Sequence, residues 1–152
     1  MPLPDSELIQ RLLLAALLGA VLGIERELKQ KPAGLRTNIL IALGSALFAI
    51  LSIELAAGVG DRTRIVAQVI TGVGFLGAGA IMRTDSGVQG LTTAATVWVN
   101  AAVGVAAGGG QYHLALAATG VTVAVLFVLA PIENAIARRV AQKSENGRST
   151  DA

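Results

Sequence analysis

Long apolar segments alternate with short polar connections along nearly the whole chain. An α-helix rises about 1.5 Å per residue, so roughly 20 residues are needed to cross the roughly 30 Å of hydrocarbon in a bilayer. Charged residues are almost absent from the segment interiors, which also lack the polar face that a helix of a soluble bundle needs. The pattern predicts an all-α membrane helix bundle with five transmembrane helices, at residues 6–25, 37–57, 63–82, 91–108 and 112–132.

Composition agrees with a membrane protein. Hydrophobic residues make up 53% of the 152 residues and charged residues only 14%, which is too apolar for an ordinary soluble domain. The absence of cysteine excludes a disulfide framework and a thiolate metal site. The net charge of +2 comes from scattered basic residues, which does not favour nucleic acid as a partner. We expect one transmembrane domain at residues 1–135 and a short basic cytoplasmic tail at residues 136–152, lying as a helix on the membrane surface.

The distribution of lysine and arginine predicts the orientation of the chain in the bacterial inner membrane. Cytoplasmic loops of membrane proteins carry an excess of these residues. With five spans, one side holds nine of them and the other side three, which places the N-terminus outside and the C-terminus in the cytoplasm. The nine are Arg26, Lys29, Lys31, Arg36, Arg83, Arg138, Arg139, Lys143 and Arg148, and the three are Arg11, Arg62 and Arg64.

Small residues recur within the spans at the spacing that lets helix backbones approach each other. Two Gly-x-x-x-Gly pairs occur, in the first and fourth spans, and the third span carries four glycines within eight residues. Such glycines favour close helix packing in membranes, and they also make self-association of the chain plausible. We predict packing roles for Gly19, Gly23, Gly72, Gly77, Gly104 and Gly108.

Polar residues form stripes on three of the predicted helices. Asn38, Ser45 and Ser52 recur every seven residues on the second span, and Gln68 and Thr71 lie one turn apart on the third. Each polar group placed in hydrocarbon costs free energy unless it finds a partner or water. These groups therefore either bond across helices as packing contacts or line a hydrated path or binding site. The intramembrane candidates are Gln68, Thr71, Thr96 and Asn100.

The chain contains an internal repeat. Leu-Gly-Ala at residues 18–20 matches residues 76–78, and Gly-Leu-x-Thr at residues 34–37 matches residues 90–93, in the same order. The matches predict a repeated two-helix hairpin, spans 1–2 and spans 3–4, followed by a fifth helix. A pseudo-twofold axis would then bring the two charged cytoplasmic loops together, as in parallel transporter repeats.

The predicted cytoplasmic cluster combines charges with two helix N-termini. The free N–H groups near Thr37 and Thr92 favour anionic partners, unless these threonines only cap their helices. Its carboxylates are expected to pair with the neighbouring arginines, so we predict no metal site and no cofactor. The cluster comprises Glu25, Arg26, Glu27, Arg36, Thr37, Asn38, Arg83, Asp85, Thr92 and Thr93.

Four runs, taken in order, resemble the MgtC/SapB family of bacterial inner-membrane proteins. They are Gly-Ile-Glu-Arg-Glu at residues 23–27, Ala-Gly-Leu-Arg-Thr-Asn at 33–38, the glycine-rich run at 68–79 and Gly-Leu-Thr-Thr-Ala-Ala at 90–95. The resemblance implies a five-span protein linked to growth in low magnesium and to survival of bacteria inside host cells. In at least one branch it implies contact with the proton-translocating ATP synthase. Better-known members carry a sizeable soluble domain after the fifth span, so activities that need that domain are not expected of the 20 residues that follow Ile132.

Two classes of function follow from these observations. A regulatory protein that acts by contact with other membrane proteins fits the small-residue faces, the resemblance, and the lack of a carboxylate near the middle of any span. A small transporter or channel with a polar cytoplasmic vestibule fits the repeat and the polar stripes. An enzyme is not expected, because His113 is the only histidine and has no obvious partner for acid–base chemistry.

Overall fold

The computed structural model describes residues 3–56, 61, 63–85 and 87–150. These residues contain five helices and a two-stranded hairpin. Three predictions reach outside it: the end of the second span at Ala57, the charge of Arg62, and the last two residues of the tail. After residue 132, side chains are described only at 135, 136 and 139. The elements are α1 (Asp5–Leu28), α2 (Leu35–Leu55), α3 (Arg64–Gly79), β1 (Met82–Thr84), β2 (Gly87–Gln89), α4 (Leu91–Gly108) and α5 (Tyr112–Thr150).

Four of the helices are long and apolar enough to cross a membrane. They are α1, α2, α4 and, within α5, the stretch Tyr112–Ile132. Their bounds lie within a few residues of the predicted spans. The described part of the chain is therefore helical and suited to a bilayer, as the apolar pattern predicts.

The third predicted span is shorter than expected. Helix α3 has 16 residues, which at about 1.5 Å per residue is roughly 24 Å, less than the hydrocarbon thickness. It ends at Gly79, after a stretch in which every second or third residue is glycine, the weakest helix former after proline. The prediction that this span continues to Met82 was wrong, because Met82 begins β1.

The loop that joins α3 to α4 is an antiparallel hairpin, which the all-α prediction did not include. Strands β1 and β2 pair in the register Met82 with Gln89 and Thr84 with Gly87. All of the residues of both strands are exposed. Glycines at the two ends of β2 take positive φ values, 122° at Gly87 and 88° at Gly90, which residues with a Cβ rarely adopt. The hairpin therefore turns the chain directly into α4.

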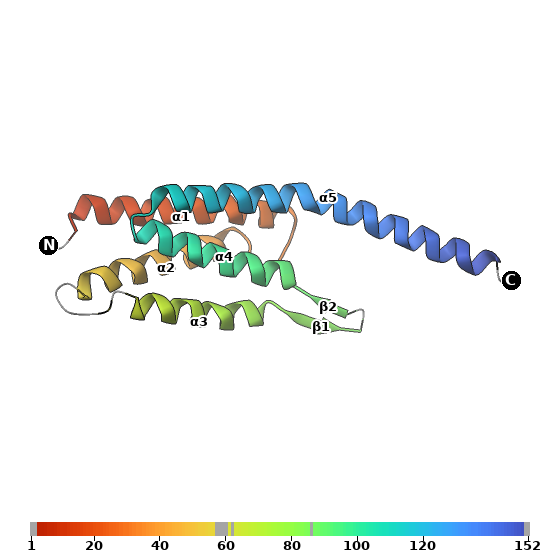
Figure 1. The fold of residues 1–152 in the computed structure, drawn as a ribbon, viewed down its shortest axis with the longest axis horizontal. Coiled ribbons are helices and arrows are strands. Elements are labelled where there is room, and N and C mark those ends of the chain that lie inside the picture. The colour runs from red at the N-terminus through yellow and green to blue at the C-terminus, as the bar shows by residue number, and fades with distance from the viewer. Residues whose placement is uncertain (1–2, 57–60, 62, 86, 151–152) are drawn as a thin grey trace.

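Helices α2 and α4 lie at the centre of the bundle. Figure 1 shows α1 and α5 along one side of them and α3 along the other, with the hairpin and the C-terminus at the end opposite the N-terminus. One buried cluster joins α1, α2, α4 and α5 and includes Leu18, Ala46 and Val103. A second joins α2, α3 and α4 and includes Ile41 and Val97. We call the two ends of the bundle the hairpin end and the Arg11 end.

Glycines on α1 and α4 allow both helices to contact the backbone of α2. A Cβ at Gly104 would lie 2.3 Å from the carbonyl oxygen of Ala42, and one at Gly108 would lie 2.3 Å from that of Ala46. Gly19 and Gly23 on α1 are equally restricted, because a Cβ there would lie 2.7 and 2.8 Å, respectively, from backbone atoms of α2. No side chain fits at these four positions unless the helices move apart.

The two glycines predicted to pack on α3 differ from these four. Gly77 makes an ordinary contact, since its Cβ would lie 3.6 Å from the carbonyl oxygen of Ala94. Gly72 is exposed, and nothing in the described part of the chain comes within 4 Å of its Cβ position. Close contact within the chain is therefore concentrated on α2, and the Gly72 side of α3 is open.

Helix α3 begins after a turn held by an aspartate. Asp61 Oδ1 accepts hydrogen bonds from the hydroxyl of Thr63, at 2.7 Å, and from its backbone N–H, at 2.8 Å. These bonds favour the charged carboxylate, so first the hydroxyl and then the N–H hold the pKa of Asp61 below its ordinary value. The turn is thus fully formed at neutral pH.

The starts of α2 and α4 are alike. Each follows a glycine N-cap, Gly34 or Gly90, and each has leucine as its first residue. Thr37 and Thr92 lie inside the first turns, and the N-caps are glycines, so the alternative that these threonines only cap their helices is wrong. The connections that precede them differ, a loop at residues 29–34 and the β1–β2 hairpin. The repeated hairpin of helices remains a prediction.

Candidate functional site

Two asparagines bond to each other in the centre of the bundle. Asn38 on α2 and Asn100 on α4 are both 0% exposed. Asn100 Nδ2 donates to the backbone oxygen of Asn38, at 2.7 Å, and to Asn38 Oδ1, at 3.0 Å. Asn38 Nδ2 in turn donates to the carbonyl oxygens of Ala33 and Gly34. This run of bonds ties the first turn of α2 to the middle of α4.

Three further polar residues of α2 and α4 also lie inside the bundle. Ser45, Ser52 and Thr96 are buried, and the Thr96 hydroxyl donates to the carbonyl oxygen of Thr92 at 2.8 Å. Between these helices, the contacts of Gly104 with Ala42 and of Gly108 with Ala46 bring the two backbones together. The geometry favours packing contacts over a hydrated path between α2 and α4.

The polar pair of α3 lies elsewhere. Gln68 and Thr71 are both exposed, and the Thr71 hydroxyl donates to the carbonyl oxygen of Ala67 in its own helix, at 3.4 Å. The structure therefore does not bring Gln68 and Thr71 together with Thr96 and Asn100. Gln68 instead lies one turn from the start of α3, beside a groove between α2 and α3.

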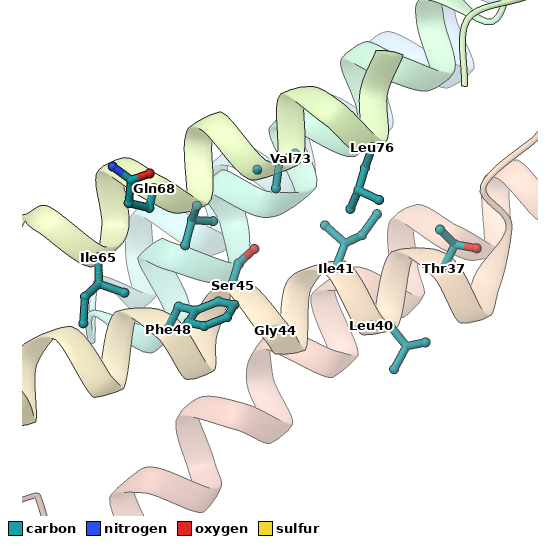
Figure 2. A pocket seen from close by; sticks show the side chains of 12 residues that line it. Thr37, Leu40, Ile41, Gly44, Ser45, Phe48, Ile65, Gln68, Val73 and Leu76 are labelled. Carbon is teal, nitrogen blue, oxygen red and sulfur yellow. The ribbon is translucent and has the colours of Figure 1, made fainter. Parts of the chain in front are cut away.

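That groove is open and apolar, with a volume of about 590 Å³. Figure 2 shows Phe48 and Ile65 close to each other at one part of it, and Ile41 and Leu76 at another. Gly44 of α2 and Gly72 of α3 also line the groove, and nothing in the described part of the chain lies within 4 Å of either Cβ position. The complete lining is Thr37, Leu40, Ile41, Gly44, Ser45, Phe48, Ile65, Gln68, Val69, Gly72, Val73 and Leu76.

Charged groups meet at the hairpin end of α1. Glu25 is 1% exposed; it pairs with Arg26, which is 4% exposed, and with Lys29 at 2.7 Å. Lys29 Nζ also donates to the carbonyl oxygen of Leu126 on α5, at 3.1 Å, and lies 5.0 Å from the centre of the Phe127 ring. The predicted pairing of Glu25 with Arg26 is present in the structure, and Lys29 connects the pair to α5.

Glu27 has a different partner from the predicted arginines. Its Oε2 accepts a hydrogen bond from the backbone N–H of Leu35 at 3.0 Å, so it satisfies one of the free donors at the start of α2. Arg36, Arg83 and Asp85 are exposed and make no ion pair within the described residues. The structure thus brings Glu25, Arg26, Glu27 and Asn38 near the start of α2. The charges of Arg36, Arg83 and Asp85 remain at the surface. Thr37 and Thr92 are exposed as well, whereas Thr93 is buried.

A cavity of about 800 Å³, lined by both charged and apolar side chains, lies at the same end, between α1, the hairpin, the start of α4 and α5. Arg26, Lys29 and Lys31 line it on one side, and Thr92 and Thr93 on another. Among the described residues, no three His, Asp or Glu side chains form a group able to hold a metal ion. The charged side chains that line the cavity, among the described residues, are all cationic.

Arg11 is a buried charge for which the sequence predicted only a place among the three basic residues on the outer side. It is 8% exposed; one guanidinium nitrogen donates to the carbonyl oxygen of Gly108 at 2.7 Å, and the other pairs with Glu7. A cation at this place satisfies a free carbonyl and the negative end of the dipole of α4. The signal in the sequence was an arginine inside an apolar run, four residues after a glutamate.

Taken together, the apolar helices, the glycine contacts and the internally bonded asparagines are those of a polytopic helical membrane protein. The family model for the MgtC family matches residues 12–135. The chain belongs to the MgtC family, as its four motifs predict.

Three relatives are similar to most of this chain. The "Putative magnesium transporter YhiD" of Escherichia coli K12 is 47% identical over 130 residues, which cover 81% of this chain and 60% of that protein. "Protein MgtC" of Salmonella typhimurium is 51% identical over 111 residues, which cover 73% of this chain and 47% of that protein. "Protein MgtC" of Brucella abortus is 47% identical over 118 residues, which cover 78% and 49%.

The chain spans about half to three fifths of the length of these curated relatives. The similarity therefore concerns the helical membrane region. No solved structure matches this chain.

Proposed function

We propose that this chain is a regulatory protein of the bacterial inner membrane that acts by direct contact with other membrane proteins, in adaptation to low magnesium. The name of the Escherichia coli relative, "Putative magnesium transporter YhiD", supports the link to magnesium. The basic hairpin end is proposed to face the cytoplasm, where lysine and arginine are enriched. The ATP synthase, which the family resemblance implies as a partner in one branch, is the first candidate partner to test.

The groove between α2 and α3 is the observation on which the proposal depends. It is apolar, open along its length, and lined by Gly44 and Gly72, whose Cβ positions have no neighbour within 4 Å in the described part of the chain. Small residues let a second helix approach closely in a bilayer, where dispersion contacts and interhelical hydrogen bonds drive association. The groove therefore suits one transmembrane helix of another protein.

Gln68 adds a polar anchor to this surface. Its side chain is exposed beside the groove and makes no hydrogen bond within the described residues. An amide that faces lipid costs free energy unless it finds a partner, and a polar group on an incoming helix would supply one. The unbonded amide of Gln68 therefore favours a protein helix over a lipid chain as the occupant of the groove.

Regulation by contact with other membrane proteins agrees with the interior of the bundle better than transport does. The central polar residues bond to each other, and glycines close the interface of α2 and α4. Carriers of cations usually hold a carboxylate near the middle of the membrane, whereas Glu25 and Glu27 lie in the last turn of α1 and are bound by neighbouring groups.

Filling the groove tests the proposal. Gly72→Leu places a side chain in open space, so the protein should insert and fold but lose the ability to support growth in magnesium-poor medium. The matched control is Gly120→Leu on α5, another exposed helical glycine with no neighbour within 4 Å in the described part of the chain. At equal protein abundance, we expect growth to fail with Gly72→Leu alone. Full growth with both variants would contradict docking in the groove.

Transport of ions or small solutes is the second candidate. The name of the Escherichia coli relative and the cavity at the hairpin end favour it. Liposomes that hold the purified protein distinguish the two functions. Saturable uptake of Mg²⁺ that Gly72→Leu leaves unchanged would support transport and contradict the contact proposal, whereas regulation by contact predicts no uptake above that of empty liposomes.

A further inference from the structure

The cavity at the hairpin end carries an excess of positive charge. Three of its lining side chains are cationic, Arg26, Lys29 and Lys31, and no carboxylate lines it among the described residues. Glu25 lies next to two of these cations and offsets one charge, which leaves a local net charge of +2. A partly enclosed space with this charge attracts anions and excludes cations.

Arg26 is buried but only partly bonded. Its Nε donates to Glu25, while its two terminal nitrogens have no hydrogen-bond partner within the described residues. The residue is 4% exposed and lines the cavity. Because these two nitrogens are free, the planar fork of the guanidinium can bind phosphate or carboxylate oxygens.

Thr93 presents a second unbonded polar group to the same space. It is 3% exposed and lines the cavity, and its hydroxyl has no hydrogen-bond partner among the described residues. The hydroxyls of Thr96 and Thr119 donate to the carbonyl four residues earlier in their helices. Thr93 lies in the first turn of α4, where this carbonyl belongs to β2, so its hydroxyl remains available.

The start of α4 faces the cavity without a carboxylate of its own. Leu91, Thr92 and Thr93 all line the cavity, and their backbone N–H groups precede the first bond of the helix, from Ala94 to Gly90. No acidic residue lies in this first turn. At the start of α2, by contrast, Glu27 occupies the corresponding donor. The N-terminus of α4 is therefore free to bind an external anion.

We propose that this cavity binds a phosphate group, held by Arg26, by the Thr93 hydroxyl and by the first N–H groups of α4, with Lys31 at its exposed edge. The same chemistry serves a soluble phosphate compound and the headgroup of an anionic phospholipid. The apolar side chains of Val125, Leu126 and Leu129 on α5 line the cavity as well and are suited to the start of an acyl chain. This inference does not depend on docking in the groove between α2 and α3.

The test measures phosphate binding by the intact protein in two arms. In the first, inorganic phosphate is titrated by calorimetry into protein held in phosphatidylcholine nanodiscs. In the second, native mass spectrometry measures retention of phosphatidylglycerol against phosphatidylcholine. We expect Thr93→Val, which keeps the volume but removes the hydroxyl, to weaken binding about tenfold. Lys31→Gln should weaken it about threefold to fivefold, and Arg36→Gln, an exposed cation of the same end outside the cavity, should leave it unchanged.

Each result has a defined meaning. Saturable binding of inorganic phosphate that follows this order of variants supports a soluble ligand. Selective retention of phosphatidylglycerol that follows the same order, without binding of inorganic phosphate, supports a lipid headgroup. Saturable binding of neither probe would overturn the proposal. So would an equal loss in Arg36→Gln and Lys31→Gln, because surface charge alone would then account for binding.

Discussion

Polar side chains connect the helices of this protein at three depths. Arg11 bonds the end of α4, the Asn38–Asn100 pair joins α2 to α4 near the centre, and Lys29 joins α1 to α5 at the hairpin end. Such bonds are worth about 0.6 kcal/mol on average in membrane proteins, and up to about 2 kcal/mol. They contribute modestly to stability, but they specify which helix faces align.

The asparagine pair gives a prediction at this scale. Asn100 Oδ1 is buried and has no hydrogen-bond partner within the described residues, which reduces the net contribution of the pair. Asn100→Ala should therefore lower the free energy of unfolding by about 1 kcal/mol rather than 3 kcal/mol. A double-mutant cycle with Asn38→Ala, measured by reversible unfolding in bicelles, should show coupling of about 0.6–2 kcal/mol.

Gln68→Ala is the control for that cycle, because Gln68 is exposed and makes no bond within the described residues. We expect it to change the free energy of unfolding by less than about 0.5 kcal/mol. Equal losses for Asn100→Ala and Gln68→Ala would show that the buried pair does not connect α2 to α4.

Residue roles were only partly predictable from the sequence. The seven-residue spacing of Asn38, Ser45 and Ser52 indicated one buried face, and all three are buried. Gln68 and Thr71, one turn apart, also share a helix face, but this face is the exposed side of α3. Helical spacing shows that residues share a face, but not which neighbour that face meets. The bond from Glu27 to the start of α2 depends on the path of the loop, which no local pattern encodes.

At the scale of the elements, glycine determines how closely the helices pack. The contacts of Gly104 and Gly108 are with backbone atoms of α2, which cannot rotate away as a side chain does. Alanine at Gly104 should therefore separate α2 from α4 and destabilise the protein by about 1–3 kcal/mol. Thermal unfolding in detergent measures this loss as a lower midpoint temperature.

Gly120→Ala provides the comparison on α5, where nothing in the described part of the chain lies within 4 Å of the added methyl group. Alanine there removes only the conformational cost of glycine, so stability should rise by up to about 1 kcal/mol. If the Gly104→Ala and Gly120→Ala variants were equally stable, the result would contradict the close approach of the α2 and α4 backbones.

The elements themselves were mostly predictable. Apolar length determined α1, α2, α4 and the first part of α5, because a bilayer permits few alternatives to a helix. The early end of α3 and the β1–β2 hairpin were missed, since both depend on glycines whose effect on the backbone varies with tertiary context. The connection to α4 shows this at Gly90, where a positive φ directs the chain into the helix.

At the scale of the whole molecule, the described part of the bundle has a packed centre, with an apolar groove and a cationic cavity open at its surface. The apolar groove lies along α2 and α3, and the cationic cavity lies at the hairpin end. The groove was not predictable, because residues from two separate helices make it. The cavity was predicted in part: Arg26, Thr92 and Thr93 of the predicted cytoplasmic cluster line it, whereas Arg36, Arg83 and Asp85 do not. The cavity joins α1, the hairpin and α5, which only the folded arrangement brings together (Figure 1). We propose the groove as the place for a membrane partner and the cavity as the place for a phosphate group.

The most direct test of the contact proposal is site-specific photo-crosslinking in growing cells. A photoreactive amino acid at Leu76, which is 53% exposed in the groove, is compared with one at Val121, which is 64% exposed on α5. We expect Leu76 to crosslink to one defined transmembrane segment of another membrane protein, and Gly72→Leu to abolish that product. Crosslinks from Leu76 to lipid alone, to a second copy of this chain, or to the same products as Val121 would contradict the proposed function.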